Sequence, residues 1–334
     1  MDAVEIAVRS DDEEFARRID PFRQELLSHC YRMLGSINDA EDLVQETYLR
    51  AWRSYGRFEG RSSLRVWLYR IATNVCLSAL EHRSRRLLPS GLGAPSDDPE
   101  RPLTIAPVET AWVQPLPGPR AEPITDPAVI VAARDSVRLA LIAALQHLPA
   151  KQRVVLILRD VLAWRAAEVA DLLDITTVAV NSLLQRARAQ LQRVAPTEDE
   201  QTDPTDPQVR ALLDQYVSAF EGADITALMA VLRDDVALEM PPNLTWFCGR
   251  AAVARFLEKD VFTVHASIRM ILITANDQPA VATYWRHDDG LYRPHAVQVL
   301  TITSTGISRI VSFNDPELFP TFGLPITLAP EVHR

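Results

Sequence analysis

The stretch Asn38-Asp39-Ala40-Glu41-Asp42-Leu43-Val44-Gln45-Glu46-Thr47-Tyr48-Leu49-Arg50-Ala51-Trp52 predicts a helix with one buried face and one acidic face. We expect Gly35 to end the helix before it and Asn38 to cap the new one, with Glu41 at the third helical position. Apolar or small residues recur at three- and four-residue spacing, as on a helix that buries one side. The other side carries Asp42, Gln45, Glu46 and Leu49.

The acidic side of this helix favours a docking surface for a basic partner. Asp42 and Glu46 stand one turn apart, where like charges destabilise a helix slightly. An acidic pair kept at that cost, with Leu49 beside it, indicates a binding partner. The alternative is a charged face that is merely solvated.

A second stretch bears on this choice. Phe58-Glu59-Gly60-Arg61-Ser62-Ser63-Leu64-Arg65-Val66-Trp67-Leu68-Tyr69-Arg70-Ile71-Ala72-Thr73-Asn74 follows, and Arg83, Arg85 and Arg86 close it. Together the two stretches resemble region 2 of the sigma-70 family, in its extracytoplasmic-function (ECF, group IV) branch. The resemblance implies that the acidic helix binds core RNA polymerase, on the coiled coil of the β′ subunit, through Asp39, Asp42, Leu43, Val44, Gln45, Glu46 and Leu49.

Size and composition predict a cytoplasmic protein of two or three domains. The chain has 334 residues, of which 47% are hydrophobic, enough for real cores. No apolar run reaches the length of a membrane span, and Met1–Ser10 has no signal-peptide core. Cys30, Cys76 and Cys248 lie far apart without metal-ligand spacing, so we expect buried thiols in a reducing compartment, with no metal and no cofactor.

The net charge of −9 is unusual for a protein that binds nucleic acid. Its distribution removes the difficulty, because arginines gather in 57–86 and basic residues again in 151–193. Acids concentrate instead in 97–122 and 198–206. Local basic patches decide affinity for DNA, so the sum over the chain does not exclude it.

Residues 10–88 form the region 2 helical bundle in this interpretation. Residues 15–33 are predicted as one helix that Pro21 could break, and Ser62 or Ser63 caps a helix running to about residue 82. A basic helix with aromatic residues and a neutral amide suits single-stranded DNA, since bases stack on rings and arginines pair with phosphates. The family places a flipped −10 base in the loop before this helix, here 57–63. The predicted −10 contacts are Arg57, Arg61, Ser63, Arg65, Trp67, Tyr69, Asn74, Arg83, Arg85 and Arg86. For Trp67 a core position is an equal alternative, and Tyr69 is expected to point outward or sideways.

Residues 89–127 are rich in Pro, Gly, Ser and acids and show no periodicity, which predicts a linker. Its centre, Trp112-Val113-Gln114-Pro115-Leu116-Pro117, is too apolar for a simple spacer. We expect it to lie along a channel of the partner or against the C-terminal domain. A partly collapsed linker is the alternative.

Residues 128–195 are predicted as a second all-α domain, with a helix-turn-helix over 167–186. The segment resembles region 4 of the same family, including the ending Asn-Ser-x-Leu-x-Arg-Ala-Arg, and region 4 reads the −35 element. Asp174 stands where the turn usually has Gly, and Asp tolerates a positive φ better than most residues. The predicted −35 contacts are Thr177, Ala179, Asn181, Ser182, Gln185, Arg186 and Arg188. A helical hairpin with no DNA role is the alternative.

A second acidic linker, 196–207, leads to mixed helix and strand patterns over 208–328. Three helices and a curved antiparallel sheet resemble the SnoaL-like cone of the nuclear-transport-factor-2 (NTF2) fold, as do Trp246-x-x-Gly249-Arg250 and Phe313-Asn314-Asp315-Pro316. The fold class is therefore multidomain: two all-α sigma domains followed by an α+β NTF2-like cone. The candidate cavity residues are Tyr216, Trp246, Tyr284, Trp285 and His295.

The sequence thus predicts a sigma factor that takes core RNA polymerase to promoter DNA and is itself no enzyme. The C-terminal domain is expected to contact region 2 and the linker and to regulate activity, without a membrane partner. One alternative is a ligand-sensing helix-turn-helix regulator that binds DNA alone, usually as a symmetric dimer. Another is an NTF2-like isomerase or hydrolase with an appended DNA-binding region, which would need a carboxylate base such as Asp235 or Glu239 in its cavity.

Overall fold

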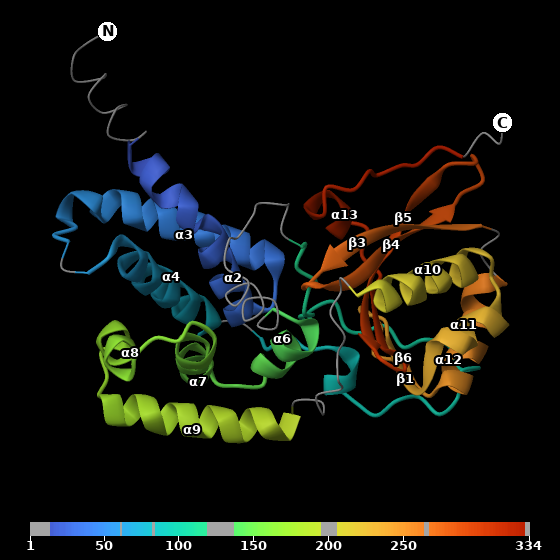
Figure 1. Cartoon of the computed structure of the whole chain (residues 1–334), viewed down its shortest axis with the longest axis horizontal. Helices are drawn as coiled ribbons and strands as arrows, with labels where there is room; N and C mark the ends of the chain where they lie inside the picture. The colour runs from blue at the N-terminus through green and yellow to red at the C-terminus, as the bar shows by residue number, and fades with distance from the viewer. Residues whose placement is uncertain are drawn as a thin grey trace, which may run out of the picture. The chain divides into compact units, whose positions relative to one another are not determined.

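A computed structural model describes residues 14–60, 62–81, 84–118, 137–194, 206–263 and 267–330. The chain divides into two compact units, each built from two separate stretches (Figure 1). The first unit combines Met1–Arg85 with Ala144–Val194, and the second combines Arg86–Ala143 with Ala195–Arg334. Most of the two predicted sigma regions therefore belongs to one unit, while the predicted linker and residues 137–143 of the predicted region 4 belong with the C-terminal domain.

The first unit is all helical. Residues 14–19 are helical, and the short helix η1 that follows contains Pro21, so the long helix expected over 15–33 is interrupted there. The elements are η1 (Asp20–Phe22), α2 (Arg23–Leu34), α3 (Ile37–Ser54), η2 (Tyr55–Arg57), α4 (Leu64–Leu80), α7 (Ala150–Leu156), the π-helical η4 (Ile157–Val161), α8 (Ala166–Leu173) and α9 (Thr177–Val194). A further helix, α6 (Leu139–Leu145), crosses the boundary between the units.

The caps of α3 and α4 come from serines. Gly35 ends α2 at φ 69°, and the backbone N–H of Asp39 donates to Ser36 Oγ at 3.2 Å. The cap is therefore Ser36 and not Asn38, and α3 begins two residues earlier than the sequence predicted. Ser63 caps α4 through the N–H of Val66, one of the two caps expected there.

The second unit is a six-stranded sheet packed against helices (Figure 1). Its elements are η3 (Pro89–Gly91), α10 (Pro207–Glu221), α11 (Ile225–Val231), β1 (Leu232–Glu239), β2 (Trp246–Cys248), α12 (Arg250–Phe256), the π-helical η5 (Leu257–Phe262), β3 (Ile268–Ala275), β4 (Gln278–Arg286), β5 (Tyr292–Thr303), β6 (Gly306–Phe313) and α13 (Leu318–Thr321). The strand order is β2-β1-β6-β5-β4-β3. The sheet is mixed and not purely antiparallel as predicted, because β1 runs parallel to β6.

The stretch 86–118 lies along this sheet domain and not free between domains. The N–H of Ser96 donates to the carbonyl of Trp246 at 2.8 Å, and Leu244 N–H donates to the carbonyl of Thr104 at 2.7 Å. Further along, Asn276 N–H donates to the carbonyl of Leu116 at 2.8 Å. Of the two positions expected for the apolar centre of the linker, these contacts correspond to the C-terminal domain. A contact of that domain with region 2 stays a prediction.

Candidate functional site

The outer face of α3 presents acidic, polar and apolar side chains together. Asp42 and Gln45 are exposed, and Leu49 is 50% exposed. Glu46 is half-buried and accepts a hydrogen bond from Arg50 Nε at 2.7 Å. Trp52 is also 50% exposed, although the sequence pattern placed it on the buried face. A tryptophan one turn beyond an exposed leucine extends the apolar part of this surface.

The inner face of α3 accounts for two other predicted polymerase contacts. Val44 is 1% exposed and belongs to the core with Ala40 and Ala51. Val44 packs in the core beneath the helix and is too buried to contact a partner. Its prediction as a polymerase contact is therefore corrected. Leu43 and Asp39 are half-buried, and Asp39 contributes its backbone N–H to the cap of the helix.

A group of aromatic rings lies around the loop before α4. The rings of Phe58 and Trp67 are 4.9 Å apart, and Tyr55 lies 6.4 Å from each of them. Trp67 is half-buried, so it is neither a full core residue nor a free surface ring. Arg57 and Ser63 beside it are exposed, whereas Arg61 and Arg83 lie outside the described residues.

The expectation that Tyr69 points outward is wrong. Tyr69 is 1% exposed, its hydroxyl donates to Glu25 Oε2 at 3.3 Å, and its ring lies 5.5 Å from that of Trp164. Burial raises the pKa of Tyr69 well above its usual range, and the Glu25 carboxylate adds to the effect. Arg65 is half-buried and binds the same Glu25 through Nε at 2.6 Å.

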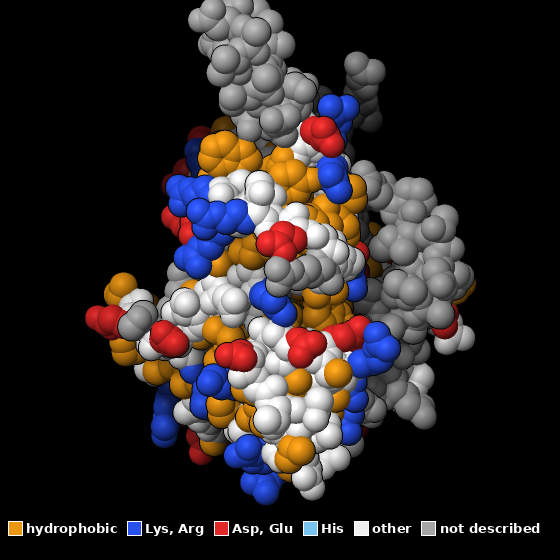
Figure 2. Space-filling model, turned by 90° about the vertical axis from the view of Figure 1, so that its left-hand side faces the viewer, with side chains coloured by type: hydrophobic (Ala, Val, Ile, Leu, Met, Phe, Trp, Pro, Cys, Tyr) orange, Lys and Arg blue, Asp and Glu red, His pale blue; other side chains and the backbone are white. Residues whose placement is uncertain are grey.

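The remaining predicted −10 residues differ in surroundings. Asn74 and Arg85 are exposed. Arg86 is half-buried and donates from Nη1 to the carbonyl of Trp112 at 2.9 Å, within the second unit. Figure 2 shows basic side chains spread among acidic and hydrophobic ones over one face of the molecule, without a field of a single sign.

Helices α8 and α9 form a helix-turn-helix. Asp174 takes φ 54° and ψ 50° at the end of α8, so the aspartate adopts the left-handed conformation that the sequence anticipated. Val180, Leu184 and Ala187 are buried and hold α9 against its neighbours. Ala179 is half-buried, and the other six predicted −35 residues are exposed: Thr177, Asn181, Ser182, Gln185, Arg186 and Arg188.

Two arginines of α9 are partly committed to neighbours. Arg188 binds Asp160 with two hydrogen bonds, at 2.9 and 2.7 Å. Arg186 donates from Nε to the carbonyl of Ser182 at 3.2 Å, one turn earlier in the helix. Their guanidinium groups are thereby oriented before any partner binds.

Helices of the two predicted sigma regions pack together inside the first unit through Arg153. This residue is 5% exposed and meets only carbonyl-type acceptors: Nη1 donates to Met33 O and to Gln146 Oε1, and Nη2 donates to Gln146 O and Leu148 O. Burial, and then the charge of Arg85, lower the pKa of Arg153 to about 10. Sequence reasoning missed this residue, since a lone arginine in a helix normally faces water.

The same packing covers part of α4. Trp164 lies against Tyr69, and Arg70 Nη2 donates to the carbonyl of Asp171 in α8 at 3.0 Å. One side of the helix predicted to hold single-stranded DNA is therefore occupied by region 4 in this structure.

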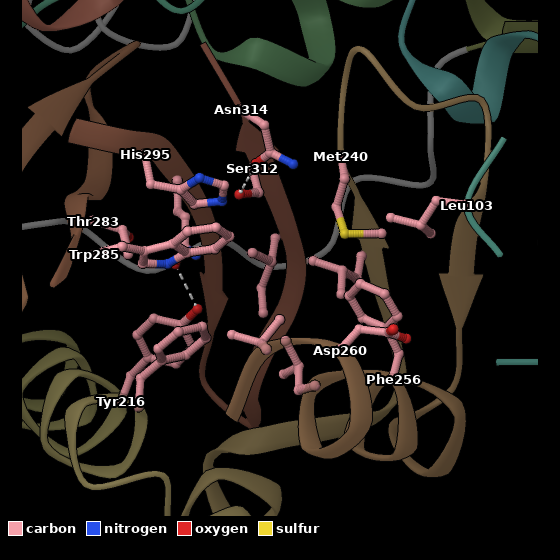
Figure 3. Close-up of a pocket in the computed structure, with 16 residues that line it drawn as sticks. Leu103, Tyr216, Met240, Phe256, Asp260, Thr283, Trp285, His295, Ser312 and Asn314 are labelled. Carbon is pink, nitrogen blue, oxygen red and sulfur yellow. Dashed lines mark hydrogen bonds between the residues drawn. The ribbon is translucent and has the colours of Figure 1, made fainter. Parts of the chain in front are cut away.

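The second unit contains a cavity of about 120 Å³ (Figure 3). Tyr216, Trp285 and His295 line it, as predicted, and the rings of Trp285 and His295 are stacked at 3.3 Å. Tyr284 points to the other side of β4, where its hydroxyl donates to the carbonyl of Pro325, because neighbouring residues of a strand face opposite ways. Trp246 is on β2 and donates to the carbonyl of Gly93. Neither lines the cavity, which corrects two of the five expected residues.

The two carboxylates that the sequence suggested as possible isomerase bases, Asp235 and Glu239, are engaged elsewhere. Asp235 is exposed and pairs with Arg233 at 2.8 Å, which lowers the pKa of its carboxyl group. Glu239 is fully buried, with Oε1 3.1 Å from Arg309 Nη2 and Oε2 accepting from the N–H of Ser90 at 2.8 Å. Neither residue lines the cavity.

Two family models match the chain. Sigma-70 region 2 matches residues 19–86, and Sigma-70, region 4 matches residues 138–191. The chain is 50% identical over 317 residues to the ECF RNA polymerase sigma factor SigG of Mycobacterium tuberculosis, covering 94% of this chain and 85% of the relative. The chain therefore belongs to the family of ECF RNA polymerase sigma factors, whose members direct the polymerase and catalyse no reaction themselves.

A second relative connects the sequence with a solved fold. The ECF RNA polymerase sigma factor SigJ of M. tuberculosis is 29% identical over 226 residues, covering 67% of this chain and 64% of the relative. The crystal structure of M. tuberculosis SigJ superposes with a TM-score of 0.59 at 22% identity, covering 93% of this chain and 99% of the other. The predicted fold class is confirmed in that helical sigma regions are followed by an α+β sheet domain.

Among the residues that the structure describes, no helix has the length and apolar character needed to cross a bilayer. The same residues contain no group of three His, Cys, Asp or Glu side chains that could hold a metal ion.

Proposed function

We propose that this sigma factor grips the polymerase with α3, holds the melted −10 strand with the start of α4 and reads the −35 element with α9. The observation that carries the proposal is the outer face of α3. Asp42, Gln45 and Leu49 are exposed there, on a helix whose opposite face is buried. A solvated surface helix has no need of the exposed Leu49 and Trp52 beside its acids.

The β′ coiled coil of core polymerase is the proposed partner of this face. The acids of α3 would meet basic side chains of the coiled coil, while Leu49 and Trp52 would bury apolar area at the centre of the contact. The ion pair of Glu46 with Arg50 holds the carboxylate in position on the helix. Val44 and Ala51 are buried on the opposite face and anchor the helix in the core of the first unit.

The −10 strand would run along the rings of Tyr55, Phe58 and Trp67. Bases stack on aromatic faces, and each stacked base contributes about 1–3 kcal/mol. Exposed Arg57 lies beside these rings and is suited to a phosphate contact. Because Trp164 and Arg70 join region 4 to α4 in this structure, we infer that region 4 swings away when the strand binds.

The −35 element would be read by the exposed polar side of α9. Asn181 and Gln185 lie one turn apart and can reach base edges in the major groove. Arg186 and Arg188 are oriented at the outer edge of the helix and suit phosphates. The left-handed Asp174 sets the angle between α8 and α9.

The C-terminal domain would regulate this activity through the segment that joins the two sigma regions. Besides the backbone bond to Leu116, the Asn276 side chain makes two bonds to that segment: its Oδ1 accepts from the N–H of Leu116 at 2.9 Å, and its Nδ2 donates to the carbonyl of Val137 at 2.6 Å. A segment fixed at both points restricts how far region 4 can move from region 2. Asn276→Gly keeps the turn at φ 55° and removes both bonds, so promoter output should rise; unchanged output would count against regulation by this route.

Binding to core polymerase tests the main proposal. The variant Asp42→Arg with Glu46→Arg reverses the charge of the α3 face without touching its buried side. It should lose binding to core polymerase and to an isolated β′ coiled coil in a titration followed by fluorescence anisotropy. The matched control, Asp214→Arg on the exposed side of α10, should bind as the natural protein does. Equal binding by both variants would refute docking through α3.

A further inference from the structure

The cavity of the C-terminal domain has an apolar body, and the hydroxyl of Thr283 is a buried polar group on its wall without a hydrogen-bond partner among the described residues (Figure 3). We propose that it binds a neutral molecule of about one six-membered ring that bears a single hydroxyl or similar hydrogen-bonding group. The proposal concerns binding alone. It stands or fails separately from the assignment of the polymerase and DNA contacts.

The size of the cavity limits the ligand. Its volume is about 120 Å³, and Phe220, Leu238 and Phe256 are among the apolar residues that line it. An apolar cavity of about 150 Å³ in another protein takes up benzene. A single ring therefore fits the space, whereas a fused polycyclic molecule would not.

The hydroxyl of Thr283 sets the polar end. Thr283 is 1% exposed and lines the cavity, and its Oγ1 has no hydrogen-bond partner among the described residues. Two other hydroxyl groups of the cavity wall already donate: Tyr216 to Gln298 Oε1 at 2.8 Å, and Ser312 to Asn314 Oδ1 at 2.9 Å. A buried hydroxyl without a partner is costly, so a ligand that supplies one gains affinity.

The charges around the cavity favour a neutral ligand. Among the described lining residues there is no Lys or Arg, and Asp260 contributes a carboxylate. A carboxylate or phosphate ligand would lose its hydration without meeting a countercharge, which is strongly unfavourable. The ring of His295 is stacked on that of Trp285.

One wall of the cavity comes from the segment between the sigma regions. Leu103 lines the cavity and packs against the domain core. Two hydrogen bonds of the Thr104 backbone hold Leu103 in this position: Thr104 N–H donates to Thr245 Oγ1 at 2.9 Å, and the N–H of Leu244 donates to the carbonyl of Thr104. A ligand in the cavity therefore touches the segment whose position bears on region 4.

Phenol, toluene and benzoate test the proposal on the full chain. They share the ring and differ in the polar group, so calorimetric titration and saturation-transfer NMR separate the contributions. The natural protein should bind phenol saturably and about fivefold more tightly than toluene, as one net hydrogen bond provides, and should not bind benzoate. Thr283→Val keeps the side-chain shape and removes the unpartnered hydroxyl, so it should fold and bind phenol and toluene equally. Thr274→Val, exposed on β3 and outside the cavity, should leave the preference unchanged.

Two outcomes would overturn the inference. One is the absence of saturable binding of both phenol and toluene by the folded natural protein. The other is a phenol preference that persists in Thr283→Val. Ile310→Phe provides a second check, because it fills part of the cavity from β6. A folded Ile310→Phe protein that binds phenol as tightly as the natural chain would place the ligand elsewhere.

Discussion

His29 makes the stability of the first unit depend on pH. The side chain is fully buried in α2, its Nε2 lies 3.0 Å from Thr73 Oγ1, and its ring meets that of Tyr69 edge-on at 5.1 Å. Burial, and then the charge of Arg32, lower the pKa of His29 from 6.5 to about 3. Its Nδ1 has no hydrogen-bond partner among the described residues, so a second proton there would be buried without an acceptor.

The sign and size follow from proton binding. Between pH 6.5 and about 3 the unfolded chain protonates this histidine and the folded unit does not. The stabilising contribution is thus fully present above pH 6.5 and is lost as the pH falls toward 3. Each pH unit costs about 1.4 kcal/mol, so the unit should lose roughly 2 kcal/mol of unfolding free energy by about pH 5.

The variant His29→Gln removes the titration and retains a donor for Thr73. Hydrogen exchange of α2 and α4 amides, read by mass spectrometry at several pH values and corrected for intrinsic rates, reports the local free energy of unfolding. Carboxylates titrate in both proteins, so the difference in slope isolates His29. The natural protein should lose protection more steeply below pH 6.5. Parallel slopes would show that His29 is protonated or exposed in the folded unit, and the reasoning would be refuted.

Three further predictions concern single side chains. Asp174→Gly should stabilise the helix-turn-helix by about 1 kcal/mol, because glycine adopts a φ of 54° without the steric cost that aspartate has there. Slower hydrogen exchange of the α8 amides would show this gain. Faster exchange would mean that the aspartate side chain stabilises the turn. Arg153→Met should cost about 3–5 kcal/mol of unfolding free energy in urea melts, because several buried carbonyl oxygens lose their donor. A loss below about 1 kcal/mol would contradict the stabilising role of the Arg153 hydrogen bonds. Arg186→Ala should weaken binding to −35 duplexes of any sequence, measured by fluorescence anisotropy. It should also reduce the slope of log affinity against log salt concentration by about one, because one phosphate contact is lost. A loss that depends on the sequence, with the slope unchanged, would show instead that Arg186 contacts a base.

Periodicity and capping residues predicted much of the fold. The helix-turn-helix is an example: α8 begins and ends at Ala166 and Leu173 as the pattern indicated, and Asp174 takes the left-handed turn position. The positions of strands β3 to β6 along the chain also follow from alternating apolar residues and turn residues. Strand β2, of three residues, is too short to produce a pattern, and the parallel pairing of β1 with β6 is decided by tertiary packing.

The candidate sites could be predicted only in part, because a helical pattern gives a face and not its neighbours. Trp52 falls on the apolar side of α3, yet half of its surface is exposed to solvent. Tyr69 would reach outward from α4, but Trp164, far along the sequence, lies on it. Nothing in the sequence around Thr283 distinguishes it from other threonines. Its hydroxyl matters only because it has no hydrogen-bond partner among the described residues in a cavity that four strands and several helices form.

Run-off transcription with purified core RNA polymerase addresses the central claim most directly. The full chain should enable the polymerase to start RNA at a promoter that the polymerase alone ignores. The variant Asp42→Arg with Glu46→Arg should be inactive, with its α2 and α4 amides still protected from exchange. Initiation by this variant at the level of the natural protein would contradict the proposed docking through α3, and a natural protein that supports no initiation at any promoter tested would contradict the function as a whole.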